Sequence, residues 1–193
     1  VFFDIAVPSG DFAFAMSAWY CRQMGIPIHN IVVCCNDNNN LWEFFNHGEL
    51  RTGRPAVSTN TPECDHSVAK LLEMIIFLCA GTTEVHRFRK CCLDSRTYFP
   101  TEEIFGKLKE GFYVSVIGQS RIEDTIMGAY STHGYVLDPY SALSYAGALD
   151  YRAQSGENRH MMLLSEKCVL HYGSYVAKVL GISGTELHKI LDS

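Results

Sequence analysis

The first 35 residues, VFFDIAVPSGDFAFAMSAWYCRQMGIPIHNIVVCC, decide the fold of this chain. Phe2–Val7 and Asn30–Cys35 are short apolar runs of the kind that form buried strands, and a helix is predicted between them from about Phe12 to Met24. A strand, a crossover helix and a second strand make a βαβ unit, whose two strands run parallel. The sequence therefore predicts an α/β fold with a mostly parallel sheet and flanking helices.

The rest of the sequence continues this alternation. A third strand is expected over His160–Leu164 and a short extended piece over Tyr135–Leu137. The polar run Asn36–Asn40 is interpreted as the turn from the second strand into the next helix, because asparagine tolerates left-handed backbone and caps helices. Asp138 and Pro139 are expected to open a helix, with proline at its first position. Apolar residues at helical spacing predict further helices over Leu41–His47, Val68–Cys79, Val85–Leu93, Thr101–Glu110, Ile122–Ser131, Ser141–Tyr151 and Tyr172–Leu180.

The composition excludes several classes of protein. Hydrophobic residues make up 47 % of the chain and charged residues 19 %, which is typical of a globular protein. The net charge of -5 and the absence of a basic block argue against nucleic acid as a partner. The longest apolar stretch, Leu71–Ala80, is too short to span a membrane. Neighbouring cysteines, as in Cys34-Cys35 and Cys91-Cys92, are expected to be buried reduced thiols, which favours a cytoplasmic location.

The pattern of the first residues predicts that this chain is a piece of a longer protein. Val1 opens an apolar strand, with no charged segment before it. We expect the strand Val1–Val7 to be central in the sheet, and missing neighbours to leave open sheet edges. The chain is therefore expected to associate with an N-terminal half or with another protein partner.

The turn after the first strand has the pattern of an anion site. Val7-Pro8-Ser9-Gly10-Asp11-Phe12 places backbone N–H groups at the start of a helix, where the helix dipole favours negative charge. On these residues alone an ordinary Asp or Ser helix cap is favoured, and a phosphate site is the alternative.

The same turn resembles the V-P-T-G-N-F-G-N segment of threonine synthases, which holds the phosphate of pyridoxal phosphate. Further segments resemble this family in the same order and at similar spacing from Val1 to Gly181. They are Arg22–Ile28 (A-K-x-M-G-L-P-I in the family), Cys35–Leu41 (T-N-x-N-D-x-L), Phe45–Gly48 (F-x-x-G), Thr61–Asp65 (S-P-S-M-D) and Gly134–Ala142 (G-Y-x-L-D-P-H-T-A).

The resemblance implies part of the fold-type II fold of pyridoxal-phosphate enzymes, which is similar to that of tryptophan synthase beta subunits. It implies a single C-terminal region over residues 1–193, and a lyase that converts O-phosphohomoserine to threonine and phosphate with the cofactor as electron sink. The ligand is then a small phosphorylated amino acid. The implied cofactor-binding residues are Ser9, Gly10, Asp11, Phe12, Ala13, Ser165 and Glu166, and the implied substrate contacts are Asn36 and Asn38.

The sequence also departs from the family pattern. Asp11 and Phe14 replace asparagines and Ala13 replaces a glycine, so the phosphate turn gains a carboxylate and loses a donor. Glu166, or Ser165 with a shift of one residue, stands where the family has serine or threonine near the pyridine nitrogen. The Schiff-base lysine of the family lies upstream of the phosphate turn, and none of the seven lysines here falls in a matching motif, so no catalytic residue is predicted.

Two classes of function follow from these observations. One is a component of a threonine-synthase-type lyase, and the other is a non-catalytic homologue that binds a phosphorylated metabolite or a protein. A metal site built from Cys64, His66, Cys168 and His171 is not expected, because the second segment offers only a lone C-x-x-H. A serine hydrolase is not expected either, because the chain has no G-x-S-x-G motif.

Overall fold

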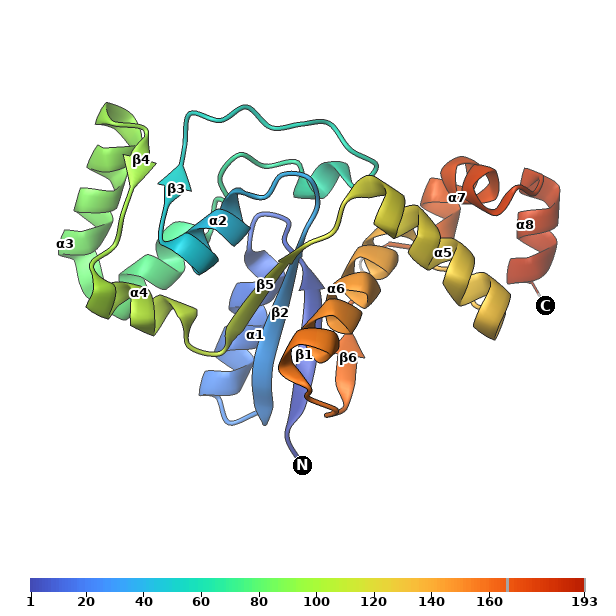
Figure 1. Ribbon diagram of the computed structural model, residues 1–193, viewed down its shortest axis with the longest axis horizontal. Coiled ribbons are helices and arrows are strands. Elements are labelled where there is room, and N and C mark those ends of the chain that lie inside the picture. The colour runs from blue at the N-terminus through green and yellow to red at the C-terminus, as the bar shows by residue number, and fades with distance from the viewer. Residues whose placement is uncertain (166, 193) are drawn as a thin grey trace.

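The centre of the protein is a four-stranded parallel sheet. A computed structural model describes residues 1–165 and 167–192, and its sheet has the strand order β5-β2-β1-β6 (Figure 1). The parallel sheet with helices around it confirms the predicted α/β fold, and three of the four strands lie where they were predicted, to within two residues. The strands are β1 (Phe3–Pro8), β2 (Ile28–Cys35), β5 (Phe112–Val116) and β6 (Met161–Leu163).

Each face of the sheet is covered by helices and carries its own hydrophobic core. Successive residues of a strand point to opposite faces, so each strand contributes to both cores. Ile31 and Val33 of β2 lie in one core, while Val32 and Cys34 lie in the other. The first core is completed by α1 (Ala13–Gln23), α2 (Asn40–His47), α3 (Leu72–Asp94) and α4 (Glu102–Lys109). The second is completed by α5 (Gln119–His133), α6 (Pro139–Ser155), α7 (Gly173–Leu180) and α8 (Gly184–Leu191).

Helix α6 approaches the sheet closely at Gly147. A Cβ atom added there would lie 2.3 Å from the Cys34 Sγ atom and 2.9 Å from the Ser115 Oγ atom. The contact between α6 and β2 therefore depends on a residue without a side chain at this position.

The starts of α4 and α6 follow the predicted signals. Thr101 caps α4 by accepting a hydrogen bond from the Ile104 N–H at 3.4 Å. Asp138 caps α6, and Pro139 is the first residue of that helix, as predicted. The two helices predicted over Val68–Cys79 and Val85–Leu93 appear as α3, which is broken at Gly81 by a backbone φ of 75°.

Some predictions were incomplete or wrong. Strand β5 and helix α8 were not predicted, nor was the antiparallel pair of β3 (Leu50–Arg51) and β4 (Thr97–Tyr98). Val136 and Leu137 are buried, but the piece Tyr135–Leu137 joins no sheet and only leads into the cap of α6. Two short 3₁₀ helices, η1 (Pro62–Cys64) and η2 (Val169–Tyr172), complete the described elements.

Strand β1 is central, as predicted, but it has neighbours on both sides. Within the described residues, the open edges of the sheet belong to β5 and β6 rather than to β1. Of the helices in the part of the chain that the structure describes, none combines the length and apolar character that a membrane span requires. Cys34 and Cys35 are buried thiols, as predicted, whereas Cys91 and Cys92 are only half-buried.

Candidate functional site at the carboxyl edge of the sheet

The predicted site residues that the structure describes gather at one edge of the sheet. Because the strands are parallel, their carboxyl ends meet at the same edge, which is where ligands bind in open α/β sheets. Ser9 follows β1, Asn36 follows β2 and Ser165 lies two residues beyond β6. The structure thus brings together the three segments that the sequence assigned to one site.

The turn after β1 is tight and has a buried anchor. The Phe12 N–H donates to the Ser9 carbonyl oxygen at 2.8 Å, and the backbone φ angles of Gly10 and Phe12 are 44° and 75°. The Phe12 ring is fully buried, with ring centroids of Phe45 and Phe112 at 5.8 Å and 5.7 Å. This aromatic packing holds a left-handed backbone that a non-glycine residue rarely adopts. The side chain of Phe12 therefore belongs to the core, and only its backbone belongs to the turn.

Several backbone donors at the start of α1 remain available. The Asp11 carbonyl accepts from the Leu71 N–H at 3.0 Å. Within the described residues, the N–H groups of Gly10, Asp11 and Phe14 donate to no acceptor. Unpaired donors at a helix N-terminus fit a phosphate group. The Asp11 carboxylate opposes this fit. Its negative charge repels a phosphate, and it already occupies the Ala13 N–H, from which it accepts at 3.0 Å. The helix-cap interpretation is wrong for Asp11: the N-cap of α1 is Phe12, which makes no side-chain cap bond, and Asp11 lies one residue before it.

A small hollow opens beside the turn. Its lining includes the predicted residues Ser9, Gly10 and Asn38, together with Cys64, His66 and Ser67. The last three were not predicted as site residues. Cys64 lies in the segment Thr61–Asp65, and His66 and Ser67 follow it directly. The resemblance of this segment to a family motif was the signal that could have placed these residues at the site.

Asn36 and Asn38 form a polar network with the chain that crosses above them. The Asn36 amide is 1 % exposed and donates to the Asp65 carboxylate at 2.7 Å and to the Thr59 hydroxyl at 2.8 Å. The Asn38 amide also donates to Asp65, at 3.0 Å, and the Asn38 Oδ1 atom accepts from the Val57 N–H at 2.7 Å. The network fixes a loop over the site, and the prediction that both asparagines contact substrate stays a prediction.

This loop, residues 52–71, is called the strap below. In Figure 1 it runs along the upper edge of the sheet, between β3 and α3. Besides the asparagine network, the Glu63 N–H donates to the Tyr140 hydroxyl at 3.1 Å, and the Asn60 N–H donates to the Gln119 side chain at 3.4 Å. The Lys167 ammonium lies 2.8 Å from the Glu63 carboxylate.

Ser165 lies next to the cap of α6. Its hydroxyl accepts from the Ser141 hydroxyl at 2.8 Å and donates to the Asp138 carboxylate at 3.3 Å. Asp138 is buried and also accepts from the backbone N–H groups of Tyr140 and Ser141, at 2.9 Å and 3.2 Å. The predicted contact Glu166 lies outside the described residues.

Burial keeps two weakly acidic side chains near the site, the Cys35 thiol and the Tyr140 hydroxyl, neutral. Burial, reinforced by the neighbouring Cys64, raises the pKa of the Cys35 thiol to about 12, although a hydrogen bond with Ser9 opposes the shift. Burial and the hydrogen bond with Tyr172 raise the pKa of the Tyr140 hydroxyl. Neither group is ionised near pH 7, so neither is a ready nucleophile or base. Among residues 1–165 and 167–192, no three His, Cys, Asp or Glu side chains are grouped to hold a metal ion.

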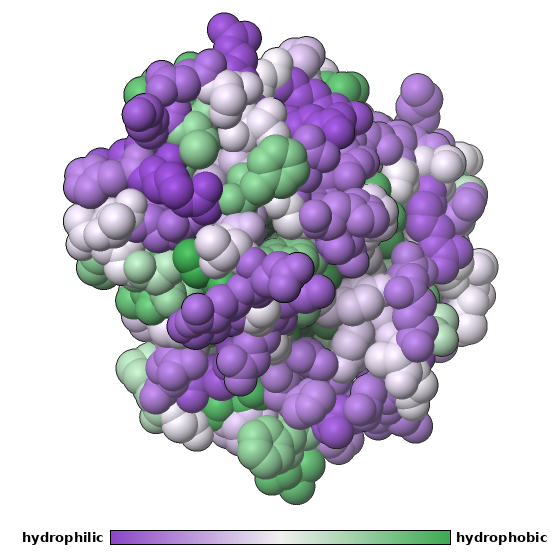
Figure 2. All heavy atoms as spheres, turned by 60° about the vertical axis from the view of Figure 1, so that its left-hand side comes forward, coloured by the Kyte–Doolittle hydropathy of each residue, from purple (hydrophilic) through white to green (hydrophobic). Residues whose placement is uncertain are grey.

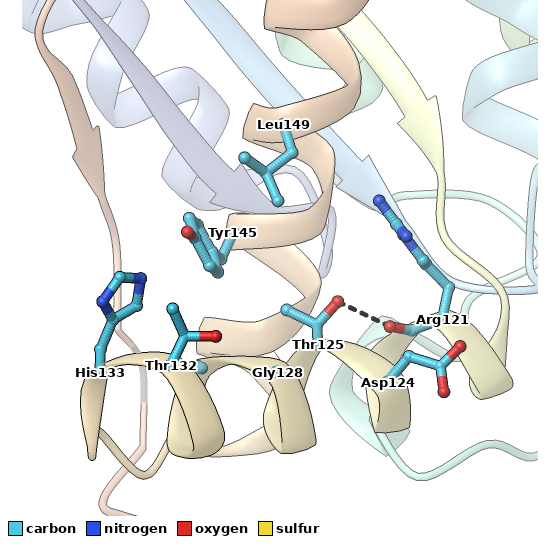
Figure 3. Close-up of a pocket in the computed structure, with 9 residues that line it drawn as sticks. Arg121, Asp124, Thr125, Gly128, Thr132, His133, Tyr145 and Leu149 are labelled. Carbon is cyan, nitrogen blue, oxygen red and sulfur yellow. Dashed lines mark hydrogen bonds between the residues drawn. The ribbon is translucent and has the colours of Figure 1, made fainter.

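A second concavity lies away from the carboxyl-edge site. Figure 3 shows it between α5 and α6, with Asp124, Thr132 and His133 on one side and Tyr145 and Leu149 on the other. It contains none of the predicted site residues. Figure 2 shows a face of the molecule that is mostly hydrophilic, with separate hydrophobic spots rather than one apolar patch.

The sheet, its helices and the site at its carboxyl edge define the class of protein. The fold is that of the fold-type II pyridoxal-phosphate enzymes. It superposes on a pyridoxal-phosphate-bound threonine synthase from Brucella melitensis with a TM-score of 0.87, at 21 % identity, over 94 % of this chain and 39 % of that one.

The sequence relatives narrow the class to a family. The chain is 38 % identical to the threonine synthase of Corynebacterium glutamicum over 92 % of its length, and 30 % identical to human threonine synthase-like 1 over 73 % of its length. It is a homologue of the threonine synthases and threonine synthase-like proteins over most of its length. It spans only 38 % and 19 % of these two curated relatives. No protein-family model matches the chain.

Proposed function

We propose that this chain is the part of a threonine synthase-like protein that binds the phosphate end of pyridoxal phosphate, with the turn Ser9–Ala13 as the phosphate cradle. One observation carries the proposal. The N–H groups of Gly10, Asp11 and Phe14 are unpaired within the described residues, and they lie at the start of α1 on the carboxyl edge of the sheet. Donors in this arrangement stabilise a phosphate through hydrogen bonds and the helix dipole together.

The other residues of the site orient the ligand. Ser165, fixed by Asp138 and Ser141, holds a hydroxyl at the end of the site that the family resemblance assigns to the pyridine nitrogen. Asn36 and Asn38 hold the strap over the cradle. When bound, pyridoxal phosphate supplies an electron sink for chemistry at the α-carbon of an amino acid.

The family reaction, conversion of O-phosphohomoserine to threonine, also needs a lysine that moves protons. No lysine of this chain lies in a motif that matches the family lysine. We therefore assign binding and orientation to these residues and leave proton transfer to a lysine supplied by the remainder of the protein or by a partner. The buried thiols Cys34 and Cys35 support a reducing compartment, such as the cytoplasm, as the place of action.

A non-catalytic homologue is the second candidate function. The Asp11 carboxylate on the Ala13 N–H favours it, because this internal anion competes for the donors that a phosphate would use. In that case the chain binds a protein or a weakly held phosphorylated metabolite at the same edge.

Titration with pyridoxal phosphate, with pyridoxal as the control ligand, tests the proposal. Binding is followed by the fluorescence of Trp19 and Trp42. Saturable quenching by pyridoxal phosphate but not by pyridoxal supports the phosphate cradle. Equal quenching by both compounds would indicate reaction of the aldehyde with surface lysines and would count against the cradle. No quenching by either compound would favour the non-catalytic homologue.

A further inference from the structure

Three arginines line one concavity beside the antiparallel pair of β3 and β4. Arg51 is the last residue of β3, Arg54 follows it by three residues, and Arg96 directly precedes β4. The pairing of Arg51 with Thr97 brings these segments together. Figure 1 shows β3 and β4 side by side, on the opposite side of the molecule from α7 and α8. A cluster of cations thus forms in a chain whose net charge is -5.

The cations of this concavity outnumber its acidic groups. Arg51 is paired with Glu49 at 2.8 Å, and among the described residues of the lining Glu43 is the acidic one. Within the part of the chain that the structure describes, neither Arg54 nor Arg96 forms an ion pair. Two guanidinium groups therefore have a charge that no neighbouring carboxylate has taken up.

The backbone of Arg96 has a conformation that glycine normally occupies. Helix α3 ends with the C-cap Ser95, and Arg96 follows with a φ of 56°. Glycine is the usual residue at this position, because a side chain there is strained. The Arg96 carbonyl oxygen accepts from the Thr52 N–H at 2.8 Å. The Arg96 stem lies against Gly53, where an added Cβ would come within 3.0 Å of the Arg96 Cδ atom. The fold thus keeps a strained residue whose side chain lines the concavity, and such strain points to a function.

The Arg54 guanidinium is oriented before any ligand binds. Its Nη1 atom donates to the Asn39 side-chain oxygen at 2.9 Å, and among the described residues its remaining N–H groups have no acceptor. A guanidinium binds phosphate oxygens through two parallel hydrogen bonds. The concavity has a volume of about 480 Å³, which is in the range of small-molecule sites. Because Arg54 and Arg96 come from different segments, each can bind its own phosphate group.

We propose that this concavity, called the arginine site below, binds a ligand with two linked phosphate groups through Arg54 and Arg96, with Arg51 as a third contact. The arginine site shares no lining residue with the hollow beside the cradle, so this inference does not depend on the proposed function. It gives the chain a second anion site, built from side chains rather than from backbone donors.

Isothermal titration calorimetry at low salt, with inorganic pyrophosphate, inorganic phosphate and citrate as probes, tests the proposal. Pyrophosphate should bind about tenfold tighter than phosphate, because it engages a second guanidinium group. Arg54→Gln should weaken pyrophosphate by about tenfold, the loss expected for one charge-assisted hydrogen bond. Glu43→Gln should strengthen it, because the competing carboxylate is gone. Citrate that binds as tightly as pyrophosphate would indicate an unselective polyanion site and would overturn the assignment to linked phosphates.

A matched pair of arginines controls for general surface charge. Arg51 is 61 % exposed and paired with Glu49, and Arg89 of α3 is 58 % exposed and paired with Glu73. Arg51→Gln should weaken pyrophosphate, whereas Arg89→Gln should leave its Kd unchanged. Equal losses from both variants would mean that pyrophosphate responds to net charge alone and would refute the arginine site.

Arg96→Gly separates a binding role from a structural one. Glycine adopts the left-handed backbone without strain, so this variant should keep or raise the melting temperature while weakening pyrophosphate by about tenfold. An arginine kept only for the fold would give the reverse, a lower melting temperature and an unchanged Kd. Pyrophosphate binding that neither Arg96→Gly nor Arg54→Gln weakens would place the anion elsewhere, for example in the cradle, and would overturn the inference.

Discussion

Replacing Asp11 by Asn should strengthen the binding of a phosphate group to the turn after β1. The Asp11 carboxylate accepts from the Ala13 N–H at 3.0 Å, beside the donors of the proposed cradle. Two like unit charges about 4 Å apart repel by about 4 kcal/mol at an effective dielectric of 20, and by about 1 kcal/mol in water. Asp11 is half-buried, which places the repulsion between these limits. We expect a gain of about 2 kcal/mol, or a roughly 30-fold lower Kd.

The assay is calorimetric titration of inorganic phosphate and of pyridoxal phosphate into the unmodified chain and the Asp11→Asn variant. The asparagine side-chain oxygen can accept the same hydrogen bond from the Ala13 N–H, so the free energy of unfolding should change by less than about 1 kcal/mol. The gain should shrink as salt is added, because salt screens the removed repulsion. Asp37→Asn, which neutralises an exposed carboxylate after β2, is the matched control and should have a smaller effect. Equal affinities of Asp11→Asn and the unmodified chain would refute the electrostatic argument.

Four further predictions concern stability and reactivity. Gly147→Ala should lower the free energy of unfolding by about 1–3 kcal/mol in urea titration, whereas Gly128→Ala, with open space around the new Cβ, should raise it by about 0.5–1 kcal/mol. Asn36→Ala should speed limited proteolysis within the strap and lower the free energy of unfolding by about 1–3 kcal/mol; an unchanged cleavage pattern would contradict the strap network. Because the folded pKa of Cys35 is raised to about 12, the unfolded state loses its thiol proton first, so stability should fall by about 1.4 kcal/mol per pH unit between about pH 9 and pH 12. At pH 8, iodoacetamide should alkylate the exposed Cys168 well before Cys35, and the opposite order would contradict the burial argument.

The strands β1 and β2 could be predicted because each is an uninterrupted apolar run, which a strand buried on both faces requires. Strand β5 was missed because Phe112–Val116 is short, contains Ser115 and directly follows the glycine that ends a helix. Its aromatic and β-branched residues were the available signal. Helix α8 was missed although Ser183 and Glu186 form a capping box at its start, and this pattern was readable from the sequence.

The location of the site could also be predicted, but its hydrogen bonding could not. The resemblance named the residues that follow β1, β2 and β6, and parallel pairing alone brings them to one edge. The sequence could not show that the Phe12 ring is buried or that the Asp11 carboxylate turns onto its own helix. Both depend on tertiary packing, because the Phe45 and Phe112 rings come from elements distant in sequence.

The strap has a consequence for how the protein folds. Its anchors lie after β2, at the starts of α5 and α6, and beyond β6, so its contacts close loops that span up to 104 residues, from Glu63 to Lys167. Contacts of such high sequence separation form late, because the entropy of loop closure must be met before they contribute. The strap should therefore order only after the sheet is complete. Slow amide exchange at Thr59 and Val57 would then report, from one short segment, that the strands and helices on both sides of the sheet have assembled.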